Sequence, residues 1–117
     1  HHTKGLQATV TAVQPPARFG VFEFDQEDNI SSFQEKPHSL RSWINGGFFV
    51  LNPSVIDRIE NDFTPWENQP LTSLALDGEL AAYRHYGFWQ PMDTLRDRNY
   101  LEELWSSGKA PWKVWNV

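Results

Sequence analysis

The sequence predicts an α/β fold in one domain. Segments that alternate apolar or β-branched residues with polar ones, as strands do, are interleaved with short segments of helical period. The length of 117 residues suits a single domain, since domains cluster at roughly 100–150 residues. With 39% hydrophobic and 15% aromatic residues, the chain has enough apolar material for a core. We therefore expect one domain over residues 1–117.

The first third of the chain predicts three strands. Residues 8–13 are β-branched at alternate positions and stop before Pro15 and Pro16, which indicates a strand that runs into a rigid loop. Residues 20–25 and 30–35 flank a polar segment whose length is typical of hairpin loops. These two segments predict a β-hairpin.

The middle of the chain predicts a buried strand followed by a helix. The apolar run Ile44–Leu51 contains two adjacent glycines, which indicates a strand whose first half approaches another group closely. Asn52 followed by Pro53 is typical of a helix start, and the apolar residues of 54–61 have helical spacing. We expect a short helix over 54–61.

The last third predicts two helices separated by a strand. A helix over 71–76 should end at Gly78, which can supply a left-handed C-terminal cap. Residues 80–86 alternate as a strand does, and the helical period returns over 94–106. The tail 111–115 is strongly aromatic, so we expect it to pack against its own domain or a neighbouring chain.

Composition excludes several classes of partner. Fifteen acidic against ten basic side chains give a net charge of −5, the wrong sign for attraction to nucleic acid. The chain has no cysteine, which excludes disulfides and thiolate metal sites. Its longest apolar run, 48–51, is far below the roughly 20 residues of a membrane span, and the first residues do not have the pattern of a signal peptide. We expect a cytoplasmic protein with no nucleic-acid or membrane partner; His1 and His2 fit a tag or native sequence.

Two short motifs could bind a sugar phosphate. In Glu35-Lys36-Pro37, the lysine could hold a phosphate and the carboxylate could accept hydrogen bonds from sugar hydroxyls, although a solvated strand end has the same pattern. In Asn45-Gly46-Gly47, the glycines allow either a strand bulge or close approach of the backbone to a hydroxyl-rich ligand.

A third motif could bind a metal ion. Asp93 and Thr94 precede the last predicted helix, where either could be the N-cap; alternatively Asp93 could bind Mg²⁺, which takes one or two carboxylates with phosphate oxygens and water. No histidine pair has the spacing of a zinc site, and no serine lies in a hydrolase elbow. No residue is singled out as catalytic.

Several motifs occur together in an order typical of one family. They are Phe33–Pro37, Ile44–Val50, Phe88–Thr94 and Gly108–Trp112, supported by Arg18–Gly20 and Leu51–Pro53. On these motifs the chain resembles the sugar-phosphate nucleotidyltransferase family, and within it the cytidylyltransferases that act on glucose 1-phosphate. The resemblance covers essentially the whole chain.

The resemblance implies a partial Rossmann-like mixed sheet and a known reaction. Enzymes of this branch join CTP to α-D-glucose 1-phosphate with Mg²⁺, releasing pyrophosphate and forming CDP-glucose, a precursor of dideoxy sugars in bacterial O-antigen. By motif, Lys36 would hold the sugar phosphate and Glu35 the glucose hydroxyls. The remaining implied residues are Asn45, Gly46 and Gly47 in the sugar pocket, Trp89 among the substrate-binding residues, and Asp93 as one of two magnesium carboxylates.

The motifs match the C-terminal, sugar-phosphate-binding half of such an enzyme. The family's glycine-rich nucleotide loop, its catalytic arginine, its base-recognition residues and its other magnesium aspartate do not occur in this sequence. CTP binding and catalysis are therefore expected only with an N-terminal half. Half of a sheet would also expose strand edges and an apolar face, which predicts a homo-oligomer.

Three functions stay open at this point. The chain could be part of such a cytidylyltransferase, inactive by itself. It could instead be a stand-alone module that binds a sugar phosphate. In the third case it is a structural or oligomerising domain, in which Asp93 is only a helix cap.

Overall fold

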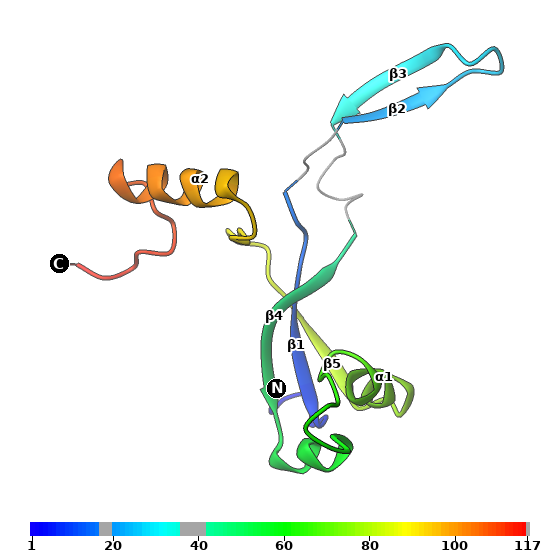
Figure 1. Ribbon diagram of the computed structural model, residues 1–117, viewed down its shortest axis with the longest axis vertical. Coiled ribbons are helices and arrows are strands. Elements are labelled where there is room, and N and C mark those ends of the chain that lie inside the picture. The colour runs from blue at the N-terminus through cyan, green and yellow to red at the C-terminus, as the bar shows by residue number, and fades with distance from the viewer. Residues whose placement is uncertain (17–19, 36–41, 117) are drawn as a thin grey trace. The chain divides into compact units, whose positions relative to one another are not determined.

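A computed structural model describes residues 1–16, 20–35 and 42–116 (Figure 1). The expected α/β class is confirmed, since strands and short helices alternate and the sheet of three strands is mixed. The chain divides into two compact units, of which unit 1 comprises His1–Val13 with Trp43–His85 and unit 2 comprises Gln14–Ser42 with Tyr86–Val117. The expected single domain over 1–117 stays a prediction.

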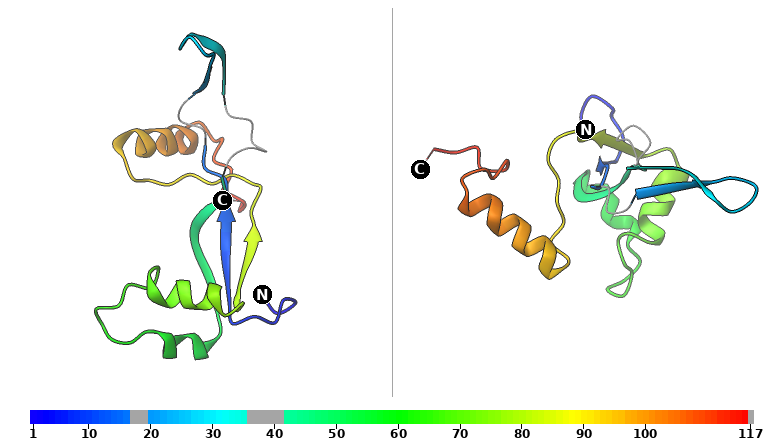
Figure 2. Two further views of the ribbon diagram at one scale, coloured as in Figure 1. Left: turned by 90° about the vertical axis from the view of Figure 1, so that its right-hand side faces the viewer. Right: turned by 90° about the horizontal axis from the view of Figure 1, so that it is seen from above.

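Strand β1 (Ala8–Val13) is the centre of the sheet in unit 1 and has the bounds expected from the sequence. Strand β4 (Ile44–Leu51) pairs antiparallel with one edge of β1, and β5 (Leu80–Arg84) pairs parallel with the other edge. The three strands run side by side in Figure 2. Among the described residues, β4 and β5 are therefore the edge strands of this sheet.

Strand β4 has the expected bounds but not the expected burial. A continuous apolar run is typical of a strand covered on both faces. In unit 1 only Gly46 of this strand is buried, whereas Phe48 and Val50 are 69% and 54% exposed. The prediction of a buried strand is wrong for this structure, because the face of β4 that carries Phe48 and Val50 has no covering layer among the described residues.

The segment after β4 forms a 3-10 helix, η2 (Pro53–Arg58), so the helix expected over 54–61 starts earlier, ends earlier and is wound more tightly. Asn52 has the extended conformation of an N-cap, but its side chain makes no cap hydrogen bond. Its Oδ1 instead contacts Nε2 of His1 at 2.8 Å. The first turn has no side-chain cap and is closed by a backbone hydrogen bond that spans three residues, from the Val55 N–H to the Asn52 carbonyl.

Helix α1 (Gln69–Leu76) confirms the second expected helix and begins two residues earlier than expected. Its end agrees with the sequence pattern, because Gly78 has φ +70° and donates its N–H to the Ala75 carbonyl at 3.2 Å. The core of unit 1 lies where these elements meet. Its buried members are Ala8, Val55 and Leu74, with the partly buried Trp66 and Leu80 packed against them.

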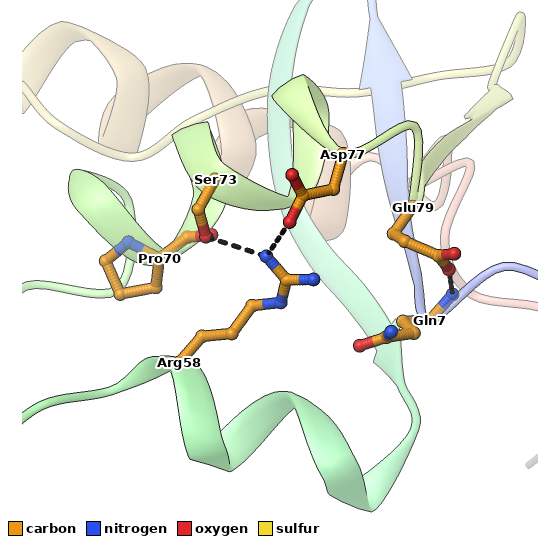
Figure 3. A network of polar contacts seen from close by, with 6 residues as sticks. All are labelled: Gln7, Arg58, Pro70, Ser73, Asp77 and Glu79. Carbon is orange, nitrogen blue, oxygen red and sulfur yellow. Dashed lines mark hydrogen bonds and ion pairs between the residues drawn. The ribbon is translucent and has the colours of Figure 1, made fainter.

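A polar network joins η2 to the C-terminal end of α1 (Figure 3). Arg58 Nη1 donates to Ser73 Oγ at 3.0 Å and to Asp77 Oδ2 at 2.8 Å. The Ser73 hydroxyl donates in turn to the Pro70 carbonyl. Because Asp77 is 59% exposed, its ion pair with Arg58 contributes at most about 1 kcal/mol. The network orients η2, whereas burial supplies most of the stability.

Unit 2 contains the expected hairpin, formed by β2 (Gly20–Phe24) and β3 (Ile30–Glu35). Its loop is held by Asp25, whose Oδ1 accepts the N–H groups of Glu27 and Asn29 at 2.9 and 3.0 Å. This pattern explains why an aspartate stands at the end of the first strand.

Unit 2 also contains helix α2 (Leu95–Ser106) and the aromatic tail. Trp112 stacks on Trp105 with 10° between the ring planes, and Trp115 lies 6.3 Å from the same ring. Phe88 contacts Trp112 from the segment before the helix. The expected packing of the tail against its own chain is confirmed. No helix within the described ranges is both long and apolar enough to cross a membrane.

Two leucines of α1, Leu74 and Leu76, provide a matched test of this core. Leu74 is fully buried and Leu76 is 83% exposed. We expect Leu74→Ala to lower the free energy of unfolding by about 2–5 kcal/mol, because it leaves a cavity, and Leu76→Ala to change it by less than about 0.5 kcal/mol. Urea unfolding followed by circular dichroism measures both. Similar losses in the two variants would contradict the core described above.

Candidate functional site

The Asn45-Gly46-Gly47 segment forms a bulge in the ladder between β4 and β1. Val10 pairs with Phe49 and Ala12 pairs with Asn45, so Thr11 alone lies opposite Gly46, Gly47 and Phe48. Gly47 has φ +87°, a conformation that residues with a Cβ rarely adopt. Of the alternatives left open by the sequence, the strand bulge is therefore present.

Gly46 is required by close packing within the sheet. A Cβ at this position would lie 2.9 Å from the Thr11 carbonyl oxygen and 3.0 Å from a methyl group of Val13. The sequence predicted that the glycines approach another group closely. For Gly46, that group is strand β1. At Gly47 a Cβ would meet no atom within 4 Å, and the residue is exposed.

The bulge fixes the side chain of Asn45. Asn45 Oδ1 accepts the backbone N–H of Gly47 at 2.7 Å. Because a backbone N–H can only donate, the amide oxygen must face Gly47, and Nδ2 must face the other way. There Nδ2 donates a short hydrogen bond to Glu67 Oε2.

Glu67 was not found by sequence reasoning. It lies in the turn before α1, and its contact with Asn45 joins residues 22 positions apart. The turn is anchored on one side by Trp66, which packs on the core and meets the ring of Phe49 edge-on at 5.6 Å. Neither periodicity nor a local motif could have indicated this contact, since it depends on how two separate segments fold together.

The Glu35-Lys36 motif is described only in part. Glu35 is the last residue of β3 and pairs with Gly20, but its side chain lies outside the described part of the structure. Lys36 lies outside the described residues altogether. Their roles in binding a sugar phosphate stay predictions.

Trp89 is partly buried in unit 2, beside a cavity of about 300 Å³. The cavity has both polar and apolar walls, formed by Gln14, Pro16, Gly87, Phe88, Trp89, Gln90 and Tyr100. A mixed lining of this kind suits a small polar ligand with an apolar ring face. The substrate-binding role of Trp89 stays a prediction.

Asp93 is not the cap of α2. Thr94 is the N-cap, and its hydroxyl accepts the Asp97 N–H while Asp97 Oδ2 accepts the N–H groups of Thr94 and Asp93, each at 3.2 Å. Asp97 is buried, and its Oδ1 also accepts Gln90 Nε2. The reciprocal spacing of Thr94 and Asp97 in the sequence was a signal for this capping box.

The exposed carboxylate of Asp93 is therefore not needed for capping. Within the described ranges, no group of three or more His, Cys, Asp or Glu side chains could hold a metal ion by itself. A lone exposed carboxylate still fits Mg²⁺, which completes its shell with phosphate oxygens and water. The structure thus brings Asn45, Gly46 and Gly47 together with Glu67 in unit 1, while Glu35, Trp89 and Asp93 belong to unit 2.

The described residues form a mixed α/β sheet with a glycine bulge in β4. Residues 1–90 match the sequence model of the family described as Nucleotidyl transferase, and the chain belongs to that family.

Among similar proteins, a glucose-1-phosphate cytidylyltransferase of Salmonella typhi is 61% identical over 98% of this chain and 44% of its own length. A Drosophila melanogaster mannose-1-phosphate guanylyltransferase catalytic subunit beta is 38% identical over 86% of the chain and 27% of its own length. The chain spans less than half the length of either relative.

A solved Bacillus anthracis structure, assigned as a glucose-1-phosphate thymidylyltransferase in complex with a sucrose, has the same fold. Its TM-score is 0.55 over 98% of this chain and 48% of that chain, at 17% sequence identity. This likeness confirms the expected Rossmann-like fold.

A comparison of two aspartates near the start of α2 tests which of them caps the helix. We expect Asp97→Ala to lower the free energy of unfolding by about 1–3 kcal/mol, because it removes the capping box and the acceptor of three partly buried hydrogen bonds. Asp93→Ala should change it by less than about 0.5 kcal/mol, since its side chain is exposed. Thermal and urea unfolding of both variants measure the difference. A comparable loss in Asp93→Ala would restore the capping role to that residue.

Proposed function

We propose that this chain is the sugar-phosphate-binding part of a glucose-1-phosphate cytidylyltransferase, which joins CTP to glucose 1-phosphate and releases pyrophosphate. The observation that carries the proposal is the 61% identity to the Salmonella typhi relative of that name over 98% of the chain. The family motifs of the sequence support the same assignment. By this proposal, the product CDP-glucose supplies dideoxy sugars for O-antigen.

In unit 1, the proposed sugar contacts lie at the bulge of β4, where Asn45 presents an amide in one orientation and Gly47 is exposed with no atom crowding it. In unit 2, Glu35 would accept hydrogen bonds from glucose hydroxyls, and Trp89 would pack against an apolar face of the sugar ring. Lys36 would hold the phosphate with its compact charge.

Magnesium is proposed to bind at Asp93. A single exposed carboxylate suits an ion that shares its remaining positions with phosphate oxygens and water. When bound, Mg²⁺ would neutralise charge on the transferring phosphate. This chain's own residues would orient the sugar phosphate, which is most of what phosphoryl-type transfer requires.

CTP is proposed to bind in the part of such an enzyme that this chain does not match. No glycine-rich loop of the kind that cradles phosphates occurs in the sequence. The chain alone should therefore bind glucose 1-phosphate without catalysing transfer. A cytoplasmic location belongs to the same proposal, since nucleoside triphosphates are cytoplasmic substrates.

A homo-oligomer is also proposed. An apolar groove of about 630 Å³ runs between β4 and η2, and its walls include Phe49, Ile56 and Ile59. Leu51 of β4 also lines this groove and is 42% exposed, which supports a contact that covers this face. Sedimentation of the purified chain measures its mass, and a monomer at all concentrations contradicts this part of the proposal.

Titration of the chain tests the sugar-phosphate site. We expect heat of binding with glucose 1-phosphate and none with CTP alone. Lys36→Ala should weaken glucose 1-phosphate binding roughly 10- to 150-fold, because a hydrogen bond to a charged group contributes about 1.5–3 kcal/mol. Lys4→Ala, at an exposed position of unit 1, is the matched control and should bind as the unaltered chain does. If neither ligand gives heat of binding, the result would instead favour a structural or oligomerising domain.

A chimeric enzyme tests the complete reaction. In it, this chain replaces the segment that it matches in the Salmonella typhi relative. We expect the chimera to form CDP-glucose from CTP and glucose 1-phosphate in the presence of Mg²⁺, measured by chromatography. Asp93→Ala should lower its turnover at least about 100-fold through lost charge neutralisation, whereas Asp62→Ala, also exposed, should not. A folded chimera that forms no CDP-glucose would exclude this activity.

A further inference from the structure

Glu67 and Asn45 form an exposed pair of complementary polar groups on unit 1. Nδ2 of Asn45 has two hydrogens, of which one is donated to Glu67 Oε2. Glu67 has a second carboxylate oxygen, and both side chains are exposed. The pair therefore offers a donor and a charged acceptor side by side at the surface of the bulge.

The pair is held in place from both sides. Asn45 cannot turn its amide over, because Gly47 N–H requires the oxygen to face the bulge. Glu67 follows Trp66, which packs on the core, and the N–H of Asn68 donates to the Pro65 carbonyl at 3.2 Å. A second contact, between the rings of Phe49 and Trp66, joins the same strand to the same turn.

We infer that Glu67 is a specificity-determining residue of the sugar pocket, which accepts a hydrogen bond from one glucose hydroxyl while Asn45 donates to its neighbour. A hydroxyl both donates and accepts, so two adjacent hydroxyls of a pyranose match a carboxylate beside an amide N–H. The hydrogen bond to the carboxylate is charge-assisted and is therefore the stronger of the two. The inference rests on the proposed function, because it deepens the same sugar site.

Glu67 also limits which ligands the site accepts. A ligand group without a hydrogen to donate, placed against the carboxylate, would leave a charged acceptor desolvated and unpaired. A sugar that lacks the matching hydroxyl is disfavoured for the same reason. The residue thus selects for hydroxyl-bearing rings, whereas a purely structural hydrogen bond to Asn45 would not discriminate among them.

Calorimetric titration of the full chain with glucose 1-phosphate and its 2-, 3-, 4- and 6-deoxy analogues tests the inference. Glu67→Gln keeps the size of the side chain and removes its charge. We expect it to weaken glucose 1-phosphate binding roughly 10-fold to 100-fold, with no change in thermal unfolding. One deoxy analogue should bind the variant and the unaltered chain equally, because it lacks the hydroxyl that Glu67 contacts. Glu60→Gln, at an exposed position of the same unit, is the matched control.

Three results would overturn the inference. Equal affinity of Glu67→Gln and the unaltered chain for glucose 1-phosphate removes Glu67 from the site and leaves the proposed function intact. An equal loss with all four deoxy analogues assigns Glu67 a structural role only. If the unaltered chain does not bind glucose 1-phosphate, the inference is overturned for this chain. The proposed function is then tested separately, by whether the chimera forms CDP-glucose.

Discussion

Strand β4 can lie against β1 only because Gly46 has no side chain, since a Cβ there would stand 2.9 Å from the Thr11 carbonyl oxygen. Real Cβ atoms essentially never come so close to a backbone oxygen. This approach allows the ladder to continue on both sides of the bulge, from Val10 with Phe49 to Ala12 with Asn45. Within the bulge, the Gly47 N–H then orients the Asn45 amide.

The polar contacts of this protein contribute to its stability according to how far they are buried. Arg58 and Asp77 form an ion pair at the surface, where solvent screens most of the attraction. Asp97 is 6% exposed and accepts three partly buried hydrogen bonds at the start of α2, so its loss would leave three donors without this acceptor. Stability therefore depends on Asp97, while the exposed side chain of Asp93 takes no part in the cap.

Local patterns were sufficient for most of the secondary structure. The alternation of residues 8–13 predicted β1 within its observed bounds, and helical period predicted the last residues of α1 and α2. These patterns work because strand and helix periodicities are properties of short segments. The segment after β4 was predicted as an ordinary short helix and is a 3-10 helix. The contact of Asn52 with His1, 51 positions away, likewise had no local signal.

Burial and the site were harder to predict for the same reason. The apolar run of β4 could not reveal that the strand lies at a sheet edge, since that depends on which strands pair with it. Gly46 and Gly47 were recognised as special, but two explanations fitted them until the Thr11 carbonyl was located. Glu67 carried no signal at all, because its partner is brought near only by the folded sheet.

The parallel pairing of β1 with β5 has a consequence for the order of folding. Gln7 and Glu79, which join the ends of these strands, are 72 positions apart, whereas the hairpin of β2 and β3 closes over a loop of a few residues. A hairpin forms in roughly 1–10 μs, but at synthesis rates of about 5–20 residues per second β5 leaves the ribosome on the order of 4–14 s after β1. During that interval β1 lacks its neighbour β5, and the edge of β1 that β5 later covers is open to pairing with other segments.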